Sequence, residues 1–336
     1  MQLHINTYGA YVHVKDQMFE IRVPDEKKTA KSHLSAHKVK SIIMTTGTAL
    51  STDAIKLAMT HNVDILFIEQ YGEPIGRVWH SKLGSTTKIR KAQLVASMNA
   101  TGVKWVKEWI LNKVDHQAQF IRDLRKHRKQ HHTLMDDKID RLENLYVSIQ
   151  QLTGETVSDI ADTLRGLEGT AGRLYFETLS KLLAKEYQFA GRSSRPAQNP
   201  FNAFLNYAYG MLYGKVERTL ILAGLDPYLG FLHRDDYNQL SFVFDFIEPY
   251  RIHAETVVFR LFSAKKINQS HTDKITNGYS LNQEGKQLLV TAFNDYIEVA
   301  TIRYRGRNQT RSNALLMDAR TFANSLIEPS TKTTAK

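Results

Sequence analysis

Residues 10–23, AYVHVKDQMFEIRV, consist of two runs of alternating apolar and polar side chains with the polar triplet KDQ between them. Such alternation on both sides of a short break predicts a half-buried β-hairpin. Residues 39–44 and 63–68 are compact apolar runs that predict two further strands. Residues 51–62 begin with a serine suited to an N-cap and continue with apolar residues at helical spacing. The beginning of the chain is therefore predicted to be a small β-rich domain with one helix.

The apolar period changes at about Thr86, and helical spacing continues through most of the remaining sequence. The predicted fold class is therefore α+β, with a small N-terminal β-rich domain followed by a larger all-α domain. We expect the first domain at residues 1–85 and the second at 86–328. The last residues, 329–336, are polar and are expected to form a frayed tail.

The composition favours a polyanionic partner. With 336 residues the chain is long enough for two domains that each bury a core. It has 45 Lys and Arg against 34 Asp and Glu, a net charge of +11. Basic side chains release the counterions condensed on phosphates, so this surplus favours nucleic acid. The alternative is a soluble protein that is merely basic.

Cysteine content and hydropathy limit the compartment. The chain has no cysteine, which excludes disulfides, thiolate metal sites and Cys nucleophiles. Its first residues, MQLHINTYG, have neither the basic nor the apolar region of a secretory signal. Charges interrupt every apolar stretch before it reaches the length of a membrane span. We expect a cytoplasmic protein that has no membrane partner.

Two basic segments are candidate DNA contacts. Residues 104–132 hold eight Lys or Arg against three acidic residues, and a solvated helix face is the alternative interpretation. Residues 303–311 are rich in arginine, whose guanidinium fork matches phosphate geometry. The candidate phosphate-binding residues of these segments are Arg125, Arg128, Lys129, Arg303, Arg305 and Arg307.

Residues 165–176, RGLEGTAGRLYF, place one carboxylate among small residues. In a helix, Glu168, Gly172 and Tyr175 would share one face. Small neighbours let a carboxylate approach a backbone or a ligand closely, so Glu168 is a candidate site residue. Close helix packing around an incidental Glu is the alternative.

Residues 230–248, GFLHRDDYNQLSFVFDFIE, combine a histidine in a joint with two acids in an aromatic run. Asp245 and Glu248 would lie on one helical face, and burying them is costly unless a cation binds them. Together with His233 they form a hard, oxygen-rich set that suits Mg²⁺ or Mn²⁺. Two further acids of this segment, Asp235 and Asp236, are alternative ligands.

Taken together, these motifs resemble one known family. RGLEGTAGRLYF is similar to the Glu motif of the CRISPR-associated spacer-acquisition integrases, the larger protein of the CRISPR adaptation module. NPFNAFLNYAYGMLYGKVERTLILAGLDPYLGFLH resembles their central signature, which ends at an active-site histidine. FDFIEPYR is similar to their acidic motif, and the N-terminal GAYVHV also fits. The resemblance covers about residues 5–325, with the motifs in the family's order.

The resemblance implies a catalytic site that contains Glu168, His233 and Glu248 as ligands of Mg²⁺ or Mn²⁺. Asp245 corresponds to the acidic residue that accompanies them. The third ligand position, often Asp in relatives, is Glu here, and its longer side chain should still reach the ion. Two further residues, Arg195 and Arg251, are expected to contact DNA.

The implied function is the insertion of short foreign DNA fragments into a CRISPR array. The 3′-hydroxyl of a fragment would attack a phosphodiester at the repeat boundary, and with water as nucleophile the site would act as an endonuclease. The family implies a homodimer formed through the β domain, with a smaller adaptation protein bridging two dimers. Two alternatives stay open: a stand-alone metal-dependent nuclease or junction-cutting enzyme, and a non-catalytic DNA-binding scaffold.

Overall fold

The structure is a computed structural model that describes residues 1–25, 29–69, 74–78, 86–194, 196–233 and 239–327. The chain divides into two compact units, Met1–Gly84 and Ser85–Lys336. In these described ranges no helix is both long enough and apolar enough to cross a membrane.

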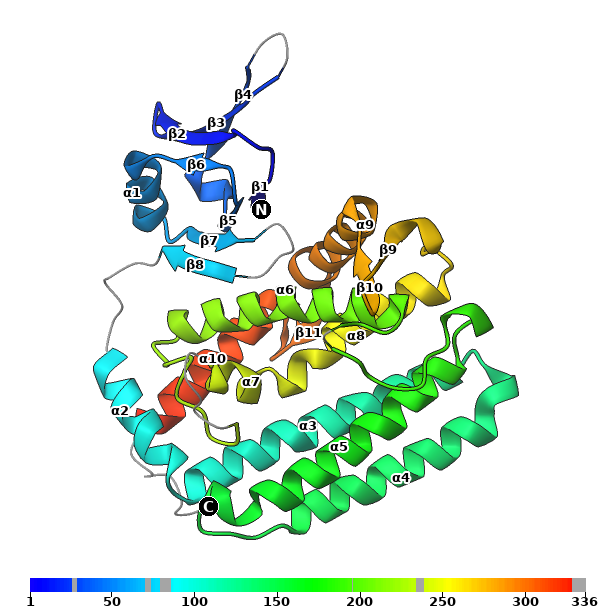
Figure 1. Ribbon diagram of the computed structural model, residues 1–336. Coiled ribbons are helices and arrows are strands. Elements are labelled where there is room, and N and C mark those ends of the chain that lie inside the picture. Colours follow the sequence, from blue (N-terminus) through cyan, green and yellow to red (C-terminus); the bar gives the residue numbers. More distant parts are fainter. Residues whose placement is uncertain (26–28, 70–73, 79–85, 195, 234–238, 328–336) are drawn as a thin grey trace. The chain divides into compact units, whose positions relative to one another are not determined.

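The described part of the first unit contains two four-stranded sheets (Figure 1). One has the order β1-β5-β7-β8, in which β8 runs antiparallel to its neighbour and the other pairs are parallel. The other has the order β4-β3-β2-β6. The strands are β1 (Gln2–Ile5), β2 (Tyr11–Lys15), β3 (Met18–Val23), β4 (Ala30–Ser35), β5 (Ser41–Thr45), β6 (Ala49–Leu50), β7 (Asp64–Ile68) and β8 (Pro74–Val78), with the 3₁₀ turn η1 (Ala36–Lys38) and the helix α1 (Thr52–Thr60) between them.

The local predictions for this unit are confirmed. The hairpin is β2–β3, and its two turn residues Asp16 and Gln17 have φ of 49° and 58°. Positive φ at both positions gives a turn whose twist matches that of the strands. Helix α1 begins after Ser51, whose side chain accepts a hydrogen bond from the Ala54 backbone N–H at 3.1 Å.

The second unit is mostly helical (Figure 1). Helices α3, α4 and α5 lie side by side and pack against one another. The helices are α2 (Thr86–Ser97), α3 (Ala100–Arg125), α4 (His132–Gln151), α5 (Val157–Lys181), α6 (Pro200–Leu222), α7 (Ser241–Phe246), α8 (Arg251–Ser263), α9 (Gln283–Asn294) and α10 (Arg311–Ile327). Shorter turns are η2 (Lys129–His131), η3 (Lys185–Tyr187), η4 (Glu248–Tyr250), η5 (Gln269–His271) and the π-helical η6 (Asp295–Val299).

Helices α6 and α8 bury residues around most of their circumference, as is typical of helices at the centre of a domain. They pack against each other, and α8 also packs on α3. The predicted fold class, a β-rich part followed by a larger helical part, is confirmed.

The larger unit is not all-α, because it also carries two short hairpins. These are β9 (Thr272–Ile275) with β10 (Gly278–Leu281), and β11 (Thr301–Tyr304) with β12 (Arg307–Thr310). Asn277 in the first turn has φ of 64°, and Arg305 and Gly306 in the second have φ of 46° and 77°. Asparagine and glycine tolerate positive φ, so Asn277 and Gly306 favour such turns, and this local signal overrides the helical spacing around them.

Candidate active site

Three helical segments far apart in the sequence meet at the side chain of Lys113. Its Nζ donates a hydrogen bond to Glu168 Oε1 and another, of 2.6 Å, to Glu248 Oε2. Lys113 lies on α3, Glu168 on α5 and Glu248 at the start of η4. The Lys113 side chain is 9% exposed and that of Glu248 6%, whereas Glu168 keeps 29% of its surface. The cluster is therefore a buried charge centre that reaches solvent through Glu168.

Space beside α5 is open at the two glycines that follow Glu168. A Cβ built on Gly169 or Gly172 would meet no atom within 4 Å among the described residues. The glycines of this motif therefore do not serve close helix packing, which was the alternative interpretation. They cost helix stability, since glycine is about 1 kcal/mol worse than alanine in a helix interior, and they leave room for a ligand beside the carboxylate.

The helix that carries the acidic motif breaks at Pro249, because a proline disfavours helical backbone at the residue before it. Helix α7 ends at Phe246, the 3₁₀ turn η4 follows, and α8 starts at Arg251. His116 of α3 donates from Nδ1 to the Pro249 carbonyl at 2.8 Å and fixes the break. Asp245 and Glu248 consequently have different neighbours.

Asp245 holds the segment that carries His233. Its carboxylate accepts the backbone N–H groups of Phe231, Leu232 and His233 at 2.5, 3.1 and 3.1 Å. It also accepts the ring Nδ1–H of His233 at 2.6 Å. That bond leaves Nε2 of His233 as the basic ring nitrogen, the arrangement found at histidines that bind metals. Asp245 is thus a positioning residue, with 1% of its side chain exposed.

Arg251 binds the carboxylate oxygen of Glu248 that Lys113 does not. Its Nε donates to Glu248 Oε1 at 2.9 Å, and its Nη1 donates to the Tyr213 hydroxyl at 3.0 Å. The guanidinium lies 5.0 Å from the ring centre of Tyr209 and 5.5 Å from that of Tyr213. Two aromatic faces and a carboxylate therefore engage a side chain that is only 16% exposed.

The charges of this cluster are strongly coupled. Burial alone would raise the pKa of Glu248, but the charges of Arg251 and Lys113 lower it to about 2. Burial would lower the pKa of Lys113, and the charges of Glu248 and Glu168 more than offset this, so its pKa is raised. The pKa of His233 is also raised, because the Asp245 hydrogen bond and charge outweigh burial. Near neutral pH Glu248 is therefore ionised between two cations, the Lys113 ammonium and the Arg251 guanidinium.

The site has the kinds of ligand that a divalent cation needs, but in this structure they are not grouped around one point. Two carboxylates converge on a cation, the Lys113 ammonium, and His233 has its Nδ1 already engaged. In the described ranges, however, no three His, Asp or Glu side chains are grouped as ligands of one ion. The donor set fits Mg²⁺ or Mn²⁺ in kind, and Lys113 lies between two of its members.

Comparison with known proteins identifies the family of this chain. The family model described as CRISPR associated protein Cas1 matches residues 3–295. The chain belongs to the Cas1 family. Among similar Cas1 proteins, the CRISPR-associated endonuclease Cas1 1 of Archaeoglobus fulgidus is 30% identical over 95% of this chain and 94% of its own. The CRISPR-associated endonuclease Cas1 2 of Saccharolobus solfataricus is 31% identical over 77% of this chain and 74% of its own.

Solved structures share the Cas1 fold of this chain. A CAS1 protein from Thermotoga maritima superposes with a TM-score of 0.78 at 18% identity, over 100% of both chains. A casposase bound to an integration product reaches a TM-score of 0.80 at 20% identity, covering 98% of this chain and 92% of its own. At such identities the likeness concerns the fold.

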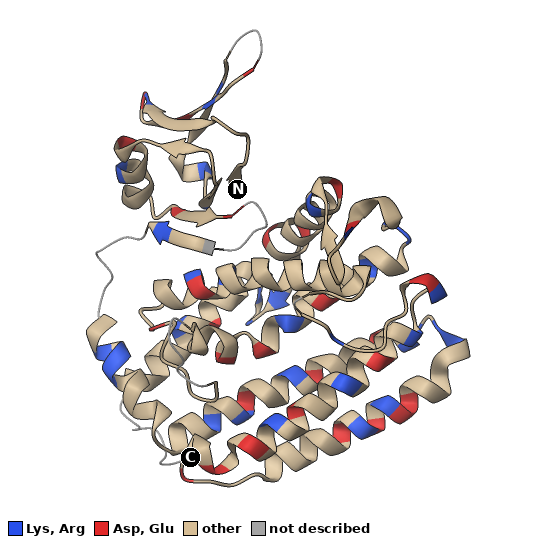
Figure 2. Ribbon diagram, in the orientation of Figure 1, with Lys and Arg blue, Asp and Glu red and all other residues tan. Residues whose placement is uncertain are grey.

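The first predicted basic segment is largely engaged within this Cas1 chain. Arg125 forms a two-pronged pair with Asp136 at 2.6 and 2.9 Å. Arg128 donates to Ser263 Oγ at 2.9 Å and lies over the Phe259 ring. The Arg125 pair ties α3 to α4, and Arg128, which precedes η2, contacts the end of α8. Basic and acidic residues are interspersed along α3–α5 (Figure 2). Lys129 opens η2 and is exposed.

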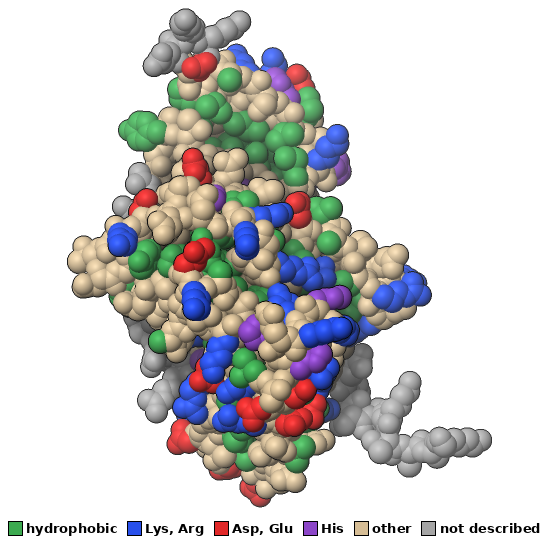
Figure 3. Space-filling model, turned by 90° about the vertical axis from the view of Figure 1, so that its right-hand side faces the viewer, with side chains coloured by type: hydrophobic (Ala, Val, Ile, Leu, Met, Phe, Trp, Pro, Cys, Tyr) green, Lys and Arg blue, Asp and Glu red, His purple; other side chains and the backbone are tan. Residues whose placement is uncertain are grey.

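The second basic segment forms the β11–β12 hairpin. Arg303 and Arg307 are exposed, whereas Arg305 is bonded to Asp318 at 3.1 Å and to Thr321 at 2.8 Å. Lys, Arg and His side chains gather near the middle of the view in Figure 3. The predicted contacts of Arg195 and the alternative ligands Asp235 and Asp236 lie outside the described residues.

Sequence reasoning missed Lys113. In the sequence, Lys113 is one of the eight basic residues of the segment 104–132 and has no feature of its own that marks it as a site residue. The signal was available in its neighbours, because Val106, Ile110 and Val114 place the buried face of α3 on the same side as Lys113. A lysine on such a face requires a carboxylate partner.

Proposed function

We propose that this chain is a metal-dependent DNA endonuclease and integrase that inserts short DNA fragments into a CRISPR array. The observation that carries the proposal is the convergence of Glu168 and Glu248 on one cation, beside open space on α5. Membership of the Cas1 family and similarity to proteins named CRISPR-associated endonucleases support it.

Glu168, Glu248 and His233 Nε2 would hold Mg²⁺ or Mn²⁺. The bound ion would supply Lewis acidity for charge on the non-bridging phosphate oxygens. Asp245 keeps the His233 ring in the tautomer that a ligand needs, and Arg251 keeps Glu248 ionised and oriented. The chain's own contribution is positioning and electrostatics, as expected for phosphoryl transfer.

In the proposed reaction the 3′-hydroxyl oxygen of a DNA fragment bonds to the phosphorus at a repeat boundary. The bond from that phosphorus to the repeat's own 3′-oxygen breaks, and this oxygen leaves as a new 3′-hydroxyl. With water as nucleophile the same exchange is hydrolysis. The open strip along Gly169 and Gly172 gives the DNA backbone a path to Glu168.

Lys113 would have two arrangements in this scheme. Without the ion, its ammonium contacts both Glu168 and Glu248, and Arg251 supplies the second positive charge at Glu248. With the ion bound, the Lys113 ammonium would have to leave at least one carboxylate and would then be available to a phosphate oxygen.

Two insertions on opposite strands require two such sites, so we propose a homodimer formed through the first unit and bridged by the smaller adaptation protein. A complex named Cas6-RT-Cas1–Cas2 contains a chain with this fold, at a TM-score of 0.75 and 18% identity. Light scattering of the chain alone tests the homodimer, and light scattering of the chain mixed with a Cas2 protein tests the bridging of two dimers.

The test is turnover of DNA fragments incubated with a plasmid that carries a CRISPR repeat. Strand joining that requires Mg²⁺ or Mn²⁺ and is abolished in Glu168→Gln and His233→Ala supports the integrase. Metal-dependent cleavage without joining supports a stand-alone nuclease instead. DNA binding without any turnover supports a scaffold. Thermal melting of both variants shows whether a loss of activity reflects unfolding.

A further inference from the structure

Buried polar groups without partners lie next to the catalytic cluster. In the described part of the chain, neither amide atom of Gln117, nor the Tyr175 hydroxyl, nor Glu255 Oε2 meets a partner with hydrogen-bond geometry. All three side chains are at most 1% exposed. Leaving buried polar groups unpaired is costly, so such a set calls for a donor that the present arrangement does not supply. We call Gln117, Tyr175 and Glu255 the acceptor layer.

The acceptor layer is formed where α3 meets α5 and α8. On α3, Gln117 follows Lys113 by one helical turn and precedes Phe120 by another, so the three share one face. The Phe120 ring lies 6.4 Å from the ring of Tyr175 on α5 and 5.7 Å from that of Phe259 on α8. Gln117 therefore lies between the level of the catalytic cluster and the level at which these three helices pack.

The spacing on the other two segments repeats this arrangement. Glu168 and Tyr175 on α5 are seven positions apart, and so are Glu248 on η4 and Glu255 on α8. Seven residues are about two helical turns, so the members of each pair lie on one side of their segment. Lys113 bonds the first member of each pair. The second members belong to the acceptor layer, on the same sides of α5 and α8.

Glu255 is a carboxylate without a bonded cation. Its Oε1 accepts the Tyr209 hydroxyl at 2.7 Å, and its Oε2 accepts no hydrogen bond in the described ranges. Burial raises the pKa of Glu255, and the Tyr209 hydrogen bond and the charge of Lys113 offset this only in part. Lys113 is thus close enough to act on Glu255 although no bond joins the two. A cation bonded to Oε2 would satisfy this oxygen and stabilise the ionised carboxylate.

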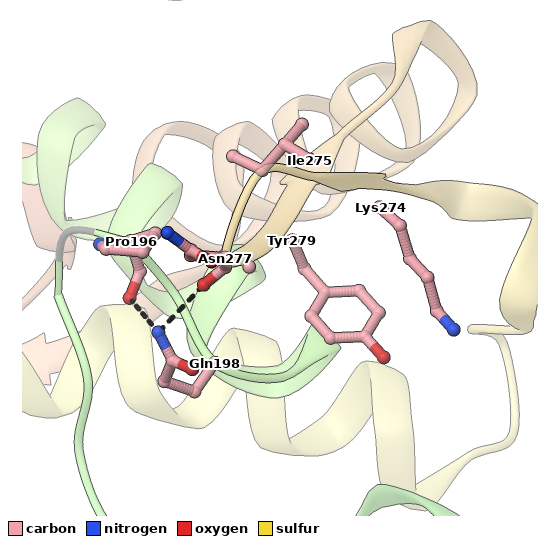
Figure 4. Close-up of a pocket in the computed structure, with 7 residues that line it drawn as sticks. Pro196, Gln198, Lys274, Ile275, Asn277 and Tyr279 are labelled. Atoms are coloured by element: carbon pink, nitrogen blue, oxygen red, sulfur yellow. Dashed lines mark hydrogen bonds between the residues drawn. The ribbon is translucent and has the colours of Figure 1, made fainter.

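The acceptor layer is closed to bulk solvent, unlike the surface pocket at the start of α6 (Figure 4). None of the residues that line that pocket belongs to the layer. Tyr209, which bonds Glu255, lies well inside the same helix. An occupant of the layer is therefore either a neighbouring side chain or a water molecule. The two differ in their response to a divalent cation, because water does not depend on the catalytic carboxylates.

An ammonium group fits these atoms. It has three donors and no acceptor, and a carboxylate oxygen, an amide oxygen and a hydroxyl oxygen can each accept one hydrogen bond from it. We propose that the acceptor layer is a second binding position for the Lys113 ammonium, occupied when a divalent cation takes over the carboxylates of Glu168 and Glu248. Glu255 is then a positioning residue that contacts neither the ion nor DNA. This inference rests on the proposed function, because it requires the cation to bind at these two carboxylates.

The move that the proposal requires is short. The Gln117 side chain leans back to the turn of α3 that carries Lys113, because Cα–Cβ bonds of a helix tilt toward its N-terminus. One turn is about 5.4 Å long, and the flexible four-carbon stem of a lysine spans such a distance. In the second position the ammonium is again paired with a carboxylate. Binding of the cation therefore does not leave an unpaired buried ammonium, which would be strongly destabilising.

The experiment is a double-mutant cycle on Mn²⁺ binding, measured by calorimetry without DNA. Glu255→Gln should weaken Mn²⁺ binding about tenfold, because the displaced ammonium loses its second carboxylate. In the Lys113→Met background the same change should alter the affinity less than about twofold, because no ammonium has to move. The matched control is Glu177→Gln, whose carboxylate bonds another buried lysine, Lys138, at 2.7 Å. It should leave Mn²⁺ affinity unchanged.

Gln117→Leu is a second variant with two opposite effects. It replaces an unpaired buried amide by an apolar side chain of similar size, so the melting temperature in EDTA should rise. It also removes one acceptor of the layer, so Mn²⁺ affinity should fall about threefold in the chain that keeps Lys113 and stay constant in the Lys113→Met background. If Glu255→Gln melts early, Gln117→Leu decides.

A crystal structure of the unchanged chain with Mn²⁺ should place Lys113 Nζ about 2.7–3.2 Å from Glu255 Oε2. Equal losses of affinity in both backgrounds, unchanged affinity in Glu255→Gln, or a water molecule on Oε2 with the ammonium elsewhere overturns the proposal. If the unchanged chain binds Mn²⁺ and turns over DNA while both backgrounds respond alike, only this inference fails. If it binds no Mn²⁺ and turns over no DNA, the proposed function fails and this inference fails with it.

Discussion

Replacing Lys113 by methionine tests the charge balance of the catalytic cluster. Methionine has about the same length and no charge, so the change removes the ammonium and little volume. Glu248, 6% exposed, would keep Arg251 but lose its 2.6 Å partner, and Glu168 would lose the same ammonium. Breaking a buried ion pair by removing one member costs about 3–5 kcal/mol. In a unit of this size that destabilisation corresponds to a drop of roughly 6–20 °C in Tm.

Divalent cations should reverse the destabilisation. In EDTA, Lys113→Met should melt well below the unchanged chain. Mn²⁺ at a hundred times its Kd for the variant should restore about 2.7 kcal/mol, since a ligand that binds only the folded state stabilises it by mass action, and the same concentration is then applied to the unchanged chain. The unchanged chain should gain less, because its ammonium competes with the ion for both carboxylates.

The assay is thermal melting of both proteins with EDTA and over a Mn²⁺ series. Lys104→Met is the control, because Lys104 is an exposed lysine of the same helix whose ammonium lies over the Trp105 ring. Equal melting of Lys113→Met and the unchanged chain in EDTA would refute the buried charge balance. An equal gain from Mn²⁺ in both would refute the competition.

Three further predictions concern the surroundings of the site. Gly172→Ala should stabilise α5 by about 0.5–1 kcal/mol in urea unfolding. Gly172→Phe should instead lower DNA turnover at least tenfold at unchanged Tm. Its control is Gly166→Phe, which also places a side chain in open space. Asp245→Asn should lower turnover or Mn²⁺ affinity about 10- to 100-fold by disturbing the His233 tautomer, and unchanged values in both would contradict that role. Neutralising Arg303 and Arg307 should lower the slope of log affinity for duplex DNA against log salt by about 0.9 for each phosphate that these arginines bind. An unchanged slope would show that the two arginines are solvated and do not contact DNA.

The sequence predicts the β-rich unit well because its signals are local. Alternation around the Lys15–Gln17 break and the Ser51 cap are decided within a few residues, and both elements are present. The two hairpins of the larger unit were missed because their strands are only four residues long. In such strands the turn pairs at Asn277 and Gly306 are the main signal, and helical spacing on either side conceals them.

For the site, too, the residues with local sequence signals were predicted, whereas their tertiary contacts were not. The two acids and the histidine were predicted from their residue types and from the motif resemblance. Spacing alone suggested that Asp245 and Glu248 act together, yet one serves His233 and the other Lys113. Which neighbour a carboxylate meets depends on tertiary packing of α3 and on the loop at Phe231. Neither is encoded near the acid in the sequence.

The central claim is that Glu168, His233 and Glu248 hold one catalytic cation. Anomalous diffraction from crystals soaked in Mn²⁺ tests it most directly. We predict one peak about 2.0–2.6 Å from oxygens of Glu168 and Glu248 and close to Nε2 of His233, with the Lys113 ammonium displaced from at least one carboxylate. A saturated crystal with no peak at these residues, or with Lys113 still bonded to both carboxylates, would contradict the account.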